Sequence, residues 1–215
     1  MIWTQRQVHE DGILSAAIHP LTNRFATGGQ DGKIIIWNTH QKNKEKVIDL
    51  GGGWIENLSW SQDGEMLAIS CSRTVYVYTK EGDEIWQSNN HNSTVSNLGW
   101  SINKELATTC YGRVCFFDGM SGKVKQKLEW KGSLVSMVLS PNSDIVVCGS
   151  QDNTIHFWRR STEQDSMMSG YPLKPSALSF DETGSYLATG GSEEVTVWSF
   201  NCLLYTSDAA DDSLR

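Results

Sequence analysis

The sequence predicts an all-β protein assembled from one repeated unit. Its 215 residues include nine tryptophans and 19 glycines but only four prolines. Tryptophan and β-branched residues favour the half-buried surface of a sheet, whereas glycine favours tight turns. Hydrophobic residues make up 39% of the chain and charged residues 20%, so a packed core is expected instead of disorder. A short aromatic run that recurs about every 40 residues indicates the repeat.

The recurrence is clearest in the third strand-like run of each repeat. Each of these runs carries an aromatic residue at the same place, and successive aromatics are 39 to 41 residues apart. The five runs are KIIIWN (33–38), TVYVYT (74–79), RVCFFD (113–118), TIHFWR (154–159) and VTVWSF (195–200), with the aromatics Trp37, Tyr78, Phe117, Trp158 and Trp198.

Two further strand-like runs precede the aromatic run in every repeat. In the first repeat they are LSAAIHP and RFATGGQD. Turn residues such as Asp31-Gly32 and Asp63-Gly64 separate the runs. A more variable fourth run, for example KVIDLG (46–51), links one repeat to the next. Each repeat is therefore expected to form one antiparallel sheet of four short strands.

Small sheets that recur in this way predict a β-propeller. An isolated small sheet is marginally stable in water, because it cannot bury both of its faces. Stacking such sheets around an axis covers both faces, at roughly 25 cal/mol per Å² of apolar surface removed from water. We expect about five four-stranded blades, in repeats at about residues 5–38, 46–79, 84–118, 123–159 and 169–200.

The repeats resemble those of the WD-repeat family. In that family His, Ser or Thr, Asp and Trp side chains form a hydrogen-bonded tetrad within a blade. The first repeat has all four, although Asn38 replaces the final Asp of the motif. The resemblance therefore implies a structural tetrad of His9, Thr27, Asp31 and Trp37.

The other repeats depart from the motif. The third repeat keeps His91 and Thr108 but has Gly112 and Phe117 at the Asp and Trp positions. The fourth repeat keeps Asp152 and Trp158 but has Lys131 and Cys148 at the other two positions. The second repeat keeps neither the His nor the turn Asp.

Family resemblance also bears on the completeness of the ring. Propellers of this family most often close with seven blades, so five repeats predict a chain truncated from seven, the alternative being a ring closed by five blades. The resemblance makes Trp3–Val8 a candidate for a strand that latches the ring. Residues 201–215 shift abruptly to small and acidic residues and resemble translated vector sequence. They are expected to form a disordered or non-native tail, the alternative being a natural acidic tail.

Charge and hydropathy argue against nucleic acid and membranes as direct partners. The formal net charge is −7, and the densest basic run, Lys42 to Lys46, is short and interrupted. No apolar stretch approaches the roughly 18 residues that span a bilayer. The first residues, MIWTQRQVHEDG, lack the apolar core of a signal peptide. A cytoplasmic or nuclear location is expected.

Motifs for catalysis or metal binding are missing from the sequence. The five cysteines include no CxxC pair, and four lie in apolar runs, as expected for buried reduced thiols. The motifs HExxH and GxSxG do not occur, and Gly51-Gly52-Gly53 lacks the lysine of a phosphate-binding loop. We therefore predict no catalytic residues, no metal site and no cofactor, and a protein that is not an enzyme.

The resemblance assigns a set of residues to the upper face, the end of the blades at which each innermost strand begins. Trp54 is the most distinctive member, since a large aromatic after three glycines can be a binding hot spot. The alternative is that Trp54 packs against a neighbouring loop. The predicted partner-binding residues are Ile13, Gln30, Trp54, Glu56, Thr94, Tyr111, Leu134, Gln151, Lys174 and Ser192.

These residues mix apolar, aromatic and polar groups, which suits peptides or protein surfaces. The predicted function is a non-catalytic protein-interaction scaffold, acting within a multiprotein complex. Two alternatives remain open: a propeller that binds a small ligand in its central channel, and a component of an RNA-associated complex. A His or carboxylate cluster at the channel mouth would favour the first, and a basic face the second.

Overall fold

The computed structural model describes residues 3–200, so the predicted tail at 201–215 lies outside the described residues. The described residues form seventeen β-strands and divide into two compact units, which meet in sequence between Val135 and Ser136. The all-β prediction is confirmed. No helix among the described residues is long and apolar enough to cross a membrane.

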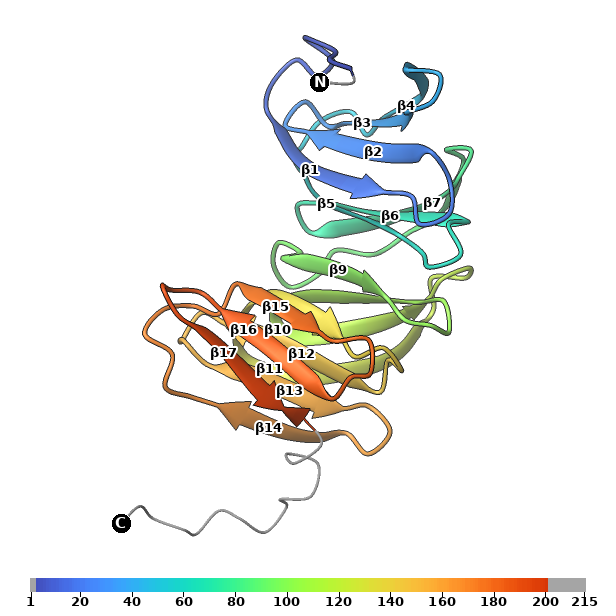
Figure 1. Cartoon of the computed structure of the whole chain (residues 1–215). Coiled ribbons are helices and arrows are strands. Elements are labelled where there is room, and N and C mark those ends of the chain that lie inside the picture. Colours follow the sequence, from blue (N-terminus) through green and yellow to red (C-terminus); the bar gives the residue numbers. More distant parts are fainter. Residues whose placement is uncertain (1–2, 201–215) are drawn as a thin grey trace, which may run out of the picture. The chain divides into compact units, whose positions relative to one another are not determined.

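The first unit begins with two sheets of four antiparallel strands, one for each of the first two repeats (Figure 1). In both sheets the strands follow chain order, so that each repeat is a simple meander. The first sheet contains β1 (Ile13–Ile18), β2 (Arg24–Gly29), β3 (Lys33–Asn38) and β4 (Asn43–Asp49). The second contains β5 (Ile55–Trp60), β6 (Met66–Cys71), β7 (Thr74–Thr79) and β8 (Glu84–Gln87).

The third repeat departs from the expected four separate strands. It contains β9 (Asn97–Trp100), the 14-residue β10 (Glu105–Asp118) and the first part of β11 (Val124–Leu139). β10 pairs with β9 through its first half and with β11 through its second half, and the register shifts between Tyr111 and Arg113. Gly112 lies at that shift with a φ of +86°, so a single glycine replaces the turn that separates the second and third strands elsewhere.

The fourth and fifth repeats follow in the second unit. The fourth contains the end of β11, then β12 (Ile145–Ser150), β13 (Ile155–Arg159) and β14 (Gln164–Met168). The fifth contains three strands: β15 (Ala177–Phe180), β16 (Tyr186–Gly190) and β17 (Val195–Ser199). β11 runs on from the third repeat into the fourth, so these two repeats share one sheet of six strands. The strands therefore form four sheets where five were expected, and the prediction of five separate blades is corrected.

Residues 3–8 do not form the predicted latch strand, because they have no regular secondary structure. The ring of Trp3 instead packs edge-on against Trp37, with 5.5 Å between the ring centroids. Its aromatic surface thereby covers part of the first sheet.

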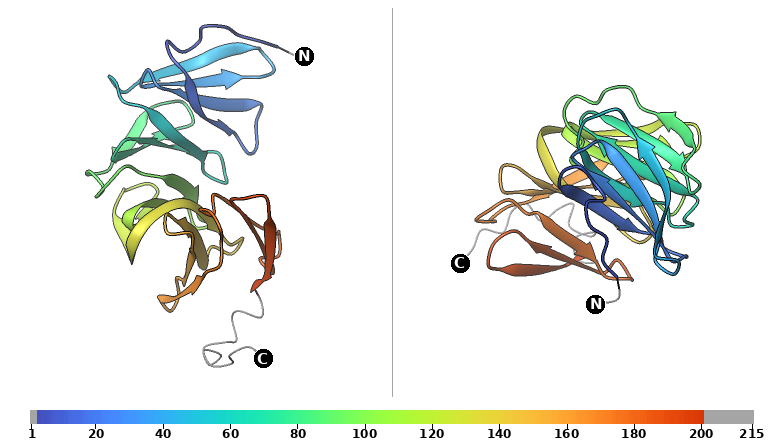
Figure 2. Two further views of the ribbon diagram at one scale, coloured as in Figure 1. Left: turned by 90° about the vertical axis from the view of Figure 1, so that its left-hand side faces the viewer. Right: turned by 90° about the horizontal axis from the view of Figure 1, so that it is seen from above.

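The core of the first unit lies between consecutive sheets, which stack face to face (Figure 2). β6 shows why, because its six residues MLAISC are all buried. Leu67 and Ile69 pack with Ile34 and Ile36 of the first sheet. The alternate residues Met66 and Ala68 pack with the third repeat, which contributes Val95, Leu98, Trp100 and Leu106. A strand buried on both faces is the arrangement that stacked blades require.

The fifth repeat has one buried and one exposed face. Leu178, Leu187 and Trp198 pack into a cluster with residues of the fourth repeat. On the other face Val195 is 73% exposed and Val197 60% exposed, and Tyr186 lies beside them. This apolar exposed face of β15–β17 has no sheet against it in the second unit.

Small polar side chains near the start of the innermost strands fasten consecutive sheets together. Each donates a hydrogen bond to the buried backbone carbonyl at which the next repeat enters its innermost strand. The donors and acceptors are 38 to 40 residues apart, close to one repeat. The bonds are Ser15 Oγ to Ile55 O (2.9 Å), Asn57 Nδ2 to Val95 O (3.2 Å), Ser96 Oγ to Leu134 O (2.6 Å) and Ser136 Oγ to Pro175 O (2.7 Å).

Candidate functional site

The four residues of the predicted tetrad lie in one hydrogen-bonded network in the first repeat. His9 comes from the loop before β1, Thr27 from β2, Asp31 from the β2–β3 turn and Trp37 from β3. His9 Nδ1 lies 3.0 Å from Asp31 Oδ1, and His9 Nε2 lies 2.9 Å from Thr27 Oγ1. The indole Nε1 of Trp37 donates to the same Thr27 oxygen at 2.9 Å. Donation therefore runs in one direction if His9 carries its proton on Nδ1.

Asp31 anchors two loops of the upper face through this network. Its carboxylate also accepts hydrogen bonds from the backbone amides of Glu10 (3.0 Å) and Lys33 (3.2 Å). Burial raises the pKa of Asp31, but these bonds and the one from His9 outweigh it and lower the pKa below its ordinary value. An ionised Asp31 thus fixes the loop before β1 against the β2–β3 turn.

The third and fifth repeats carry incomplete versions of the network. In the third, His91 Nε2 lies 3.1 Å from Thr108 Oγ1, and Nδ1 donates to the Arg73 carbonyl at 3.1 Å. In the fifth, Tyr171 occupies the His position: its hydroxyl lies 2.7 Å from Thr189 Oγ1 and accepts from the Trp198 indole at 2.8 Å.

Sequence reasoning missed Tyr171, although its spacing was a usable signal. Tyr171 precedes its threonine by 18 residues, as His9 does, and His91 precedes its threonine by 17. A search by spacing instead of residue type would have found it. In the second repeat Ile69 and Tyr78 replace the polar pair with buried apolar surface.

The upper face of the first unit presents three large exposed side chains from the predicted set. Ile13 is 52%, Trp54 54% and Tyr111 53% exposed. Thr94 is also exposed, and Gln30 and Glu56 are half-buried. Trp54 and Thr94 precede an innermost strand, whereas Ile13 and Glu56 are the first residue of β1 and the second residue of β5. Gln30 lies in the β2–β3 turn and Tyr111 at the register shift within β10. They follow the same edge of consecutive sheets and thus share one surface of the first unit.

The loop that carries Trp54 is held in place although it is glycine-rich. Gly51, Gly52 and Gly53 all have positive φ angles, of 77°, 129° and 86°. A Cβ on Gly32 would come within 2.8 Å of the Gly52 backbone, so the loop lies directly against the β2–β3 turn. The amide of Gly51 donates to Asp49 Oδ1 at 2.8 Å. Only glycines fit this path, and it leaves the Trp54 ring exposed on a fixed backbone.

Glu56 lies beside this loop with a carboxylate that is poorly solvated. Its Oε2 is inaccessible to solvent and has no hydrogen-bond partner among the described residues. Burial raises the pKa of Glu56, and a hydrogen bond from the Ser72 backbone opposes the rise.

Leu134 does not belong to the exposed set, because its side chain is 2% exposed and lies in the core. Its position in the repeat explains this. Leu134 is the residue at which the fourth repeat enters its innermost strand, equivalent to Ile55 and Val95, and all three are buried. The residue that matches Trp54 and Thr94 is Ser133, so the sequence alignment of this repeat was wrong by one residue.

The remaining predicted residues lie in the second unit. Gln151, Lys174 and Ser192 are all exposed. Gln151 is in the β12–β13 turn, whereas Lys174 precedes β15 and Ser192 is in the β16–β17 turn. The last two loops are neighbours, because a Cβ on Gly191 would overlap the Lys174 carbonyl.

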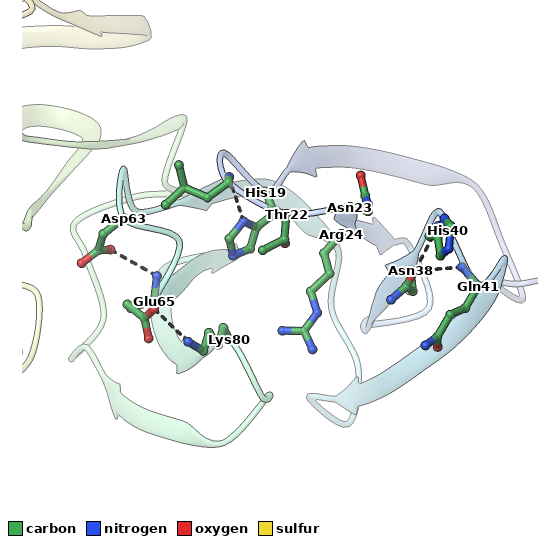
Figure 3. A pocket seen from close by; sticks show the side chains of 11 residues that line it. His19, Thr22, Asn23, Arg24, Asn38, His40, Gln41, Asp63, Glu65 and Lys80 are labelled. Atoms are coloured by element: carbon green, nitrogen blue, oxygen red, sulfur yellow. Dashed lines mark hydrogen bonds and ion pairs between the residues drawn. The ribbon is translucent and has the colours of Figure 1, made fainter.

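A cavity of about 490 Å³ opens at the opposite, lower end of the first two sheets (Figure 3). Cations reach it from both sheets, but each has a carboxylate partner. Arg24 pairs with Glu45 at 2.7 Å, and Lys80 with Glu65 at 2.8 Å. Asp63, which also lines the cavity, pairs with Lys104 of the β9–β10 turn at 2.6 Å. The charges of this cavity thus largely cancel within the chain.

His19, at the rim of this cavity, also has a structural role. Its Nε2 donates to the Gly64 carbonyl at 3.0 Å, and its Nδ1 accepts from the Leu21 amide at 3.1 Å. Both ring nitrogens are thereby occupied. Burial lowers the pKa of His19, which keeps the ring neutral.

The described residues contain no group of three His, Cys, Asp or Glu side chains that could hold a metal ion. Cys71, Cys110, Cys115 and Cys148 are free and buried. Burial raises the pKa of all four thiols, and that of Cys115 to about 11. These thiols are protonated at neutral pH and are poor nucleophiles.

Comparison with known families gives the same assignment as the repeat geometry. The model of the WD domain, G-beta repeat, matches residues 3–38 and 122–159, which are the first and fourth repeats. The chain contains WD repeats at these two places. The tetrad in the first repeat and the stacked antiparallel sheets are the structural counterparts of that match.

Several curated proteins are similar to this chain. Protein hir1 of Schizosaccharomyces pombe is 26% identical over 190 residues, which cover 71% of this chain and 20% of that protein. Pre-mRNA-splicing factor cwf17 of the same species is 27% identical, over 70% of this chain and 46% of that protein. Mitotic checkpoint protein bub-3 of Caenorhabditis elegans is 40% identical, over 33% of this chain and 20% of that protein. The chain therefore spans less than half the length of these relatives.

Proposed function

We propose that this WD-repeat protein is a non-catalytic scaffold in the cytoplasm or nucleus that binds protein segments on the upper face of its first unit. The observation that carries the proposal is the exposure of Ile13, Trp54 and Tyr111 along one edge of consecutive sheets. Large apolar groups on a fixed backbone lose little conformational entropy on binding, which suits them to be anchors. The half-buried Glu56 supplies a polar group next to Trp54.

The relatives are consistent with a role inside larger assemblies. One is named a pre-mRNA-splicing factor and another a mitotic checkpoint protein. For this chain, the scaffold role also fits the protonated buried thiols and the paired charges of the lower cavity. An alternative, in which the chain is a component of an RNA-associated complex, is compatible with the same surface if a protein contacts it.

The experiment is affinity capture from a cell extract with the immobilised full chain and its variants, quantified by mass spectrometry. We expect Trp54→Ala combined with Tyr111→Ala to reduce recovery of specific partners at least about tenfold, since hot-spot truncations cost roughly 2 kcal/mol or more. The matched control is Ile102→Ala with Met120→Ala, which removes two exposed apolar side chains at the lower end. Equal recovery with both double variants would refute the assignment of the upper face.

A further inference from the structure

A second cavity, of about 300 Å³, lies in the first unit where the third repeat departs from the tetrad. Residues 87–92, between β8 and β9, form one wall, and β10 and β11 form the other. Phe117 lines the cavity at the position of Trp37 and has no indole N–H to extend toward Thr108. Its ring lies 5.8 Å from that of His91, which also lines the cavity.

The charge of this cavity distinguishes it from the one at the lower end. Arg113 and Lys127 line it, and none of its lining residues is acidic. The Nε of Arg113 is buried and has no hydrogen-bond partner among the described residues. Arg113 forms only a long ion pair with Glu129, whose side chain is 64% exposed and whose Oε2 lies 3.7 Å from that nitrogen, too far for a hydrogen bond. A positive cavity of this kind is unexpected in a chain with a net charge of −7.

Two neutral side chains of the wall already use an oxygen as an acceptor within the chain. The side-chain oxygen of Asn90 already accepts a bond from Thr74 at 3.1 Å, which leaves its amide N–H groups to donate. Ser88 Oγ accepts from the Val75 amide at 3.0 Å, which leaves its hydroxyl hydrogen to donate. Asn89 and Asn92 add two further amide groups. An oxyanion with several acceptor oxygens satisfies such a wall better than a neutral ligand does.

We propose that this cavity binds a phosphate dianion, in addition to the protein segment proposed for Ile13, Trp54 and Tyr111. A phosphate carries close to two negative charges and three acceptor oxygens, which match Arg113, Lys127 and the donors of residues 87–92. The volume is at the lower end of the range for ligand sites, so it suits a phosphate on a side chain better than a nucleotide. His91 is not a ligand in this proposal, because both of its ring nitrogens are already hydrogen-bonded.

The test is isothermal titration calorimetry of the full chain with four probes. They are a short phosphoserine peptide, the same peptide with serine, the same peptide with glutamate, and inorganic phosphate. We expect saturable binding of the phosphate-bearing probes only. Tighter binding of the phosphopeptide assigns the site to a phosphorylated protein segment, and equal affinity assigns it to free phosphate. Absence of saturable binding, or equal affinity for the glutamate peptide, would overturn the proposal.

Three variants locate the binding in the cavity. Arg113→Gln should weaken the phosphate-bearing probes about tenfold or more, the effect of losing one charge-assisted hydrogen bond. Lys125→Gln is the charge-matched control, since Lys125 lies on β11, two residues before Lys127, but does not line the cavity, and it should leave affinity unchanged. Glu129→Gln removes the carboxylate near Arg113 and should tighten binding, a gain that misfolding cannot produce. Equal loss with Arg113→Gln and Lys125→Gln, or no gain with Glu129→Gln, would contradict the site.

Discussion

At the scale of single residues, one substitution redirects the buried histidine of a repeat. His9 in the first repeat hydrogen-bonds to the carboxylate of Asp31, whereas Gly112 occupies the equivalent position in the third repeat. His91 therefore donates to the Arg73 carbonyl, and its other nitrogen accepts from Thr108. Burial lowers the pKa of His91, and the positive charges of Arg113 and Arg73 add to the effect. The fold thus requires a neutral ring at this position.

This requirement predicts a loss of stability in mild acid. The unfolded chain binds a proton at His91 near pH 6.5, but the folded chain does so only at lower pH. The free energy of unfolding should therefore fall as the pH drops from about 7 toward 5. His19 and His156, whose pKa values burial also lowers, contribute in the same direction. Thermal unfolding followed by circular dichroism across this range measures the slope, and His91→Gln should make it shallower.

A second pH window provides the internal control. The hydrogen bond from Lys104 is the largest effect on Asp63 and holds its pKa at about 2, and hydrogen bonds from Thr183 and Tyr186 lower that of Asp181. Stability from these ionised carboxylates is present above about pH 4 and is lost below it. His91→Gln should leave this loss unchanged. A variant that keeps the full slope between pH 7 and 5 would exclude His91 as a source.

Prediction of individual residues from sequence succeeded where a motif fixed the alignment. All four tetrad positions of the first repeat were chosen by motif, and they meet in one network. Leu134 was misplaced because nothing in the fourth repeat marks the entry to the innermost strand. Tyr171 was missed because its hydroxyl makes the hydrogen bond to threonine that a histidine nitrogen makes in the first repeat, and residue type does not reveal this replacement.

At the scale of the strands, the bonds between consecutive sheets are the recurring structural device. Ser136 makes the most demanding of them, since it is buried and serves two backbone groups. Its hydroxyl donates to the Pro175 carbonyl at 2.7 Å and accepts from the Gly149 amide at 3.2 Å. A Cβ on Gly149 would overlap that same carbonyl, so the two backbones are in close approach here. β12 and the entry to β15 are therefore joined at the single hydroxyl of Ser136.

Ser136→Ala should destabilise the second unit by about 1–3 kcal/mol, because it leaves two buried backbone groups without partners. Hydrogen exchange at β12 and β15 should accelerate, and the unfolding midpoint should fall. Ser179→Ala is the matched control: Ser179 is exposed and its hydroxyl bonds only to the neighbouring Phe180 carbonyl at 3.4 Å. Equal effects of the two variants would show that the bond to Pro175 contributes nothing to stability.

Strand positions were predicted well, but their connections were not. The five aromatic runs lie on β3, β7, β10, β13 and β17, and the first run, Lys33 to Asn38, has the same ends as β3. The sequence did not reveal two continuous strands. β10 runs on through Gly112, where a turn was expected, and β11 runs on through Trp130 to Leu139, where one repeat was expected to end and the next to begin. A glycine at a positive φ is compatible with a turn and with a bulge, and the pairing of the neighbouring strands decides between them.

At the scale of the whole molecule, the uncovered apolar surface is the main liability. The exposed face of β15–β17 carries Val195, Val197 and Tyr186, and β17 has no strand at its outer edge among residues 3–200. An apolar face next to an open edge is a known route to self-association. The net charge of −7 opposes association only at long range and is screened by salt.

We therefore expect this chain to self-associate as its concentration rises. Val195→Thr with Val197→Thr should shift the association to higher concentration, because threonine keeps the β-propensity but reduces the apolar surface. Sedimentation velocity at several concentrations measures the change. Val124→Thr changes a valine of the first unit that is 49% exposed, and it should have no effect. Identical sedimentation of the parent and the double variant would show that this face is not involved.

The hydrogen bonds from Ser15, Asn57, Ser96 and Ser136 reach one repeat ahead and no further. Each interface between consecutive repeats thus depends on those two repeats alone, and the free energy of unfolding is a sum over these interfaces. A destabilising substitution in one repeat should weaken its two interfaces with neighbouring repeats and leave the other interfaces unchanged. A repeat that keeps the side-chain donor and the carbonyl acceptor of these bonds can then lose tetrad residues. The second and fourth repeats have done so.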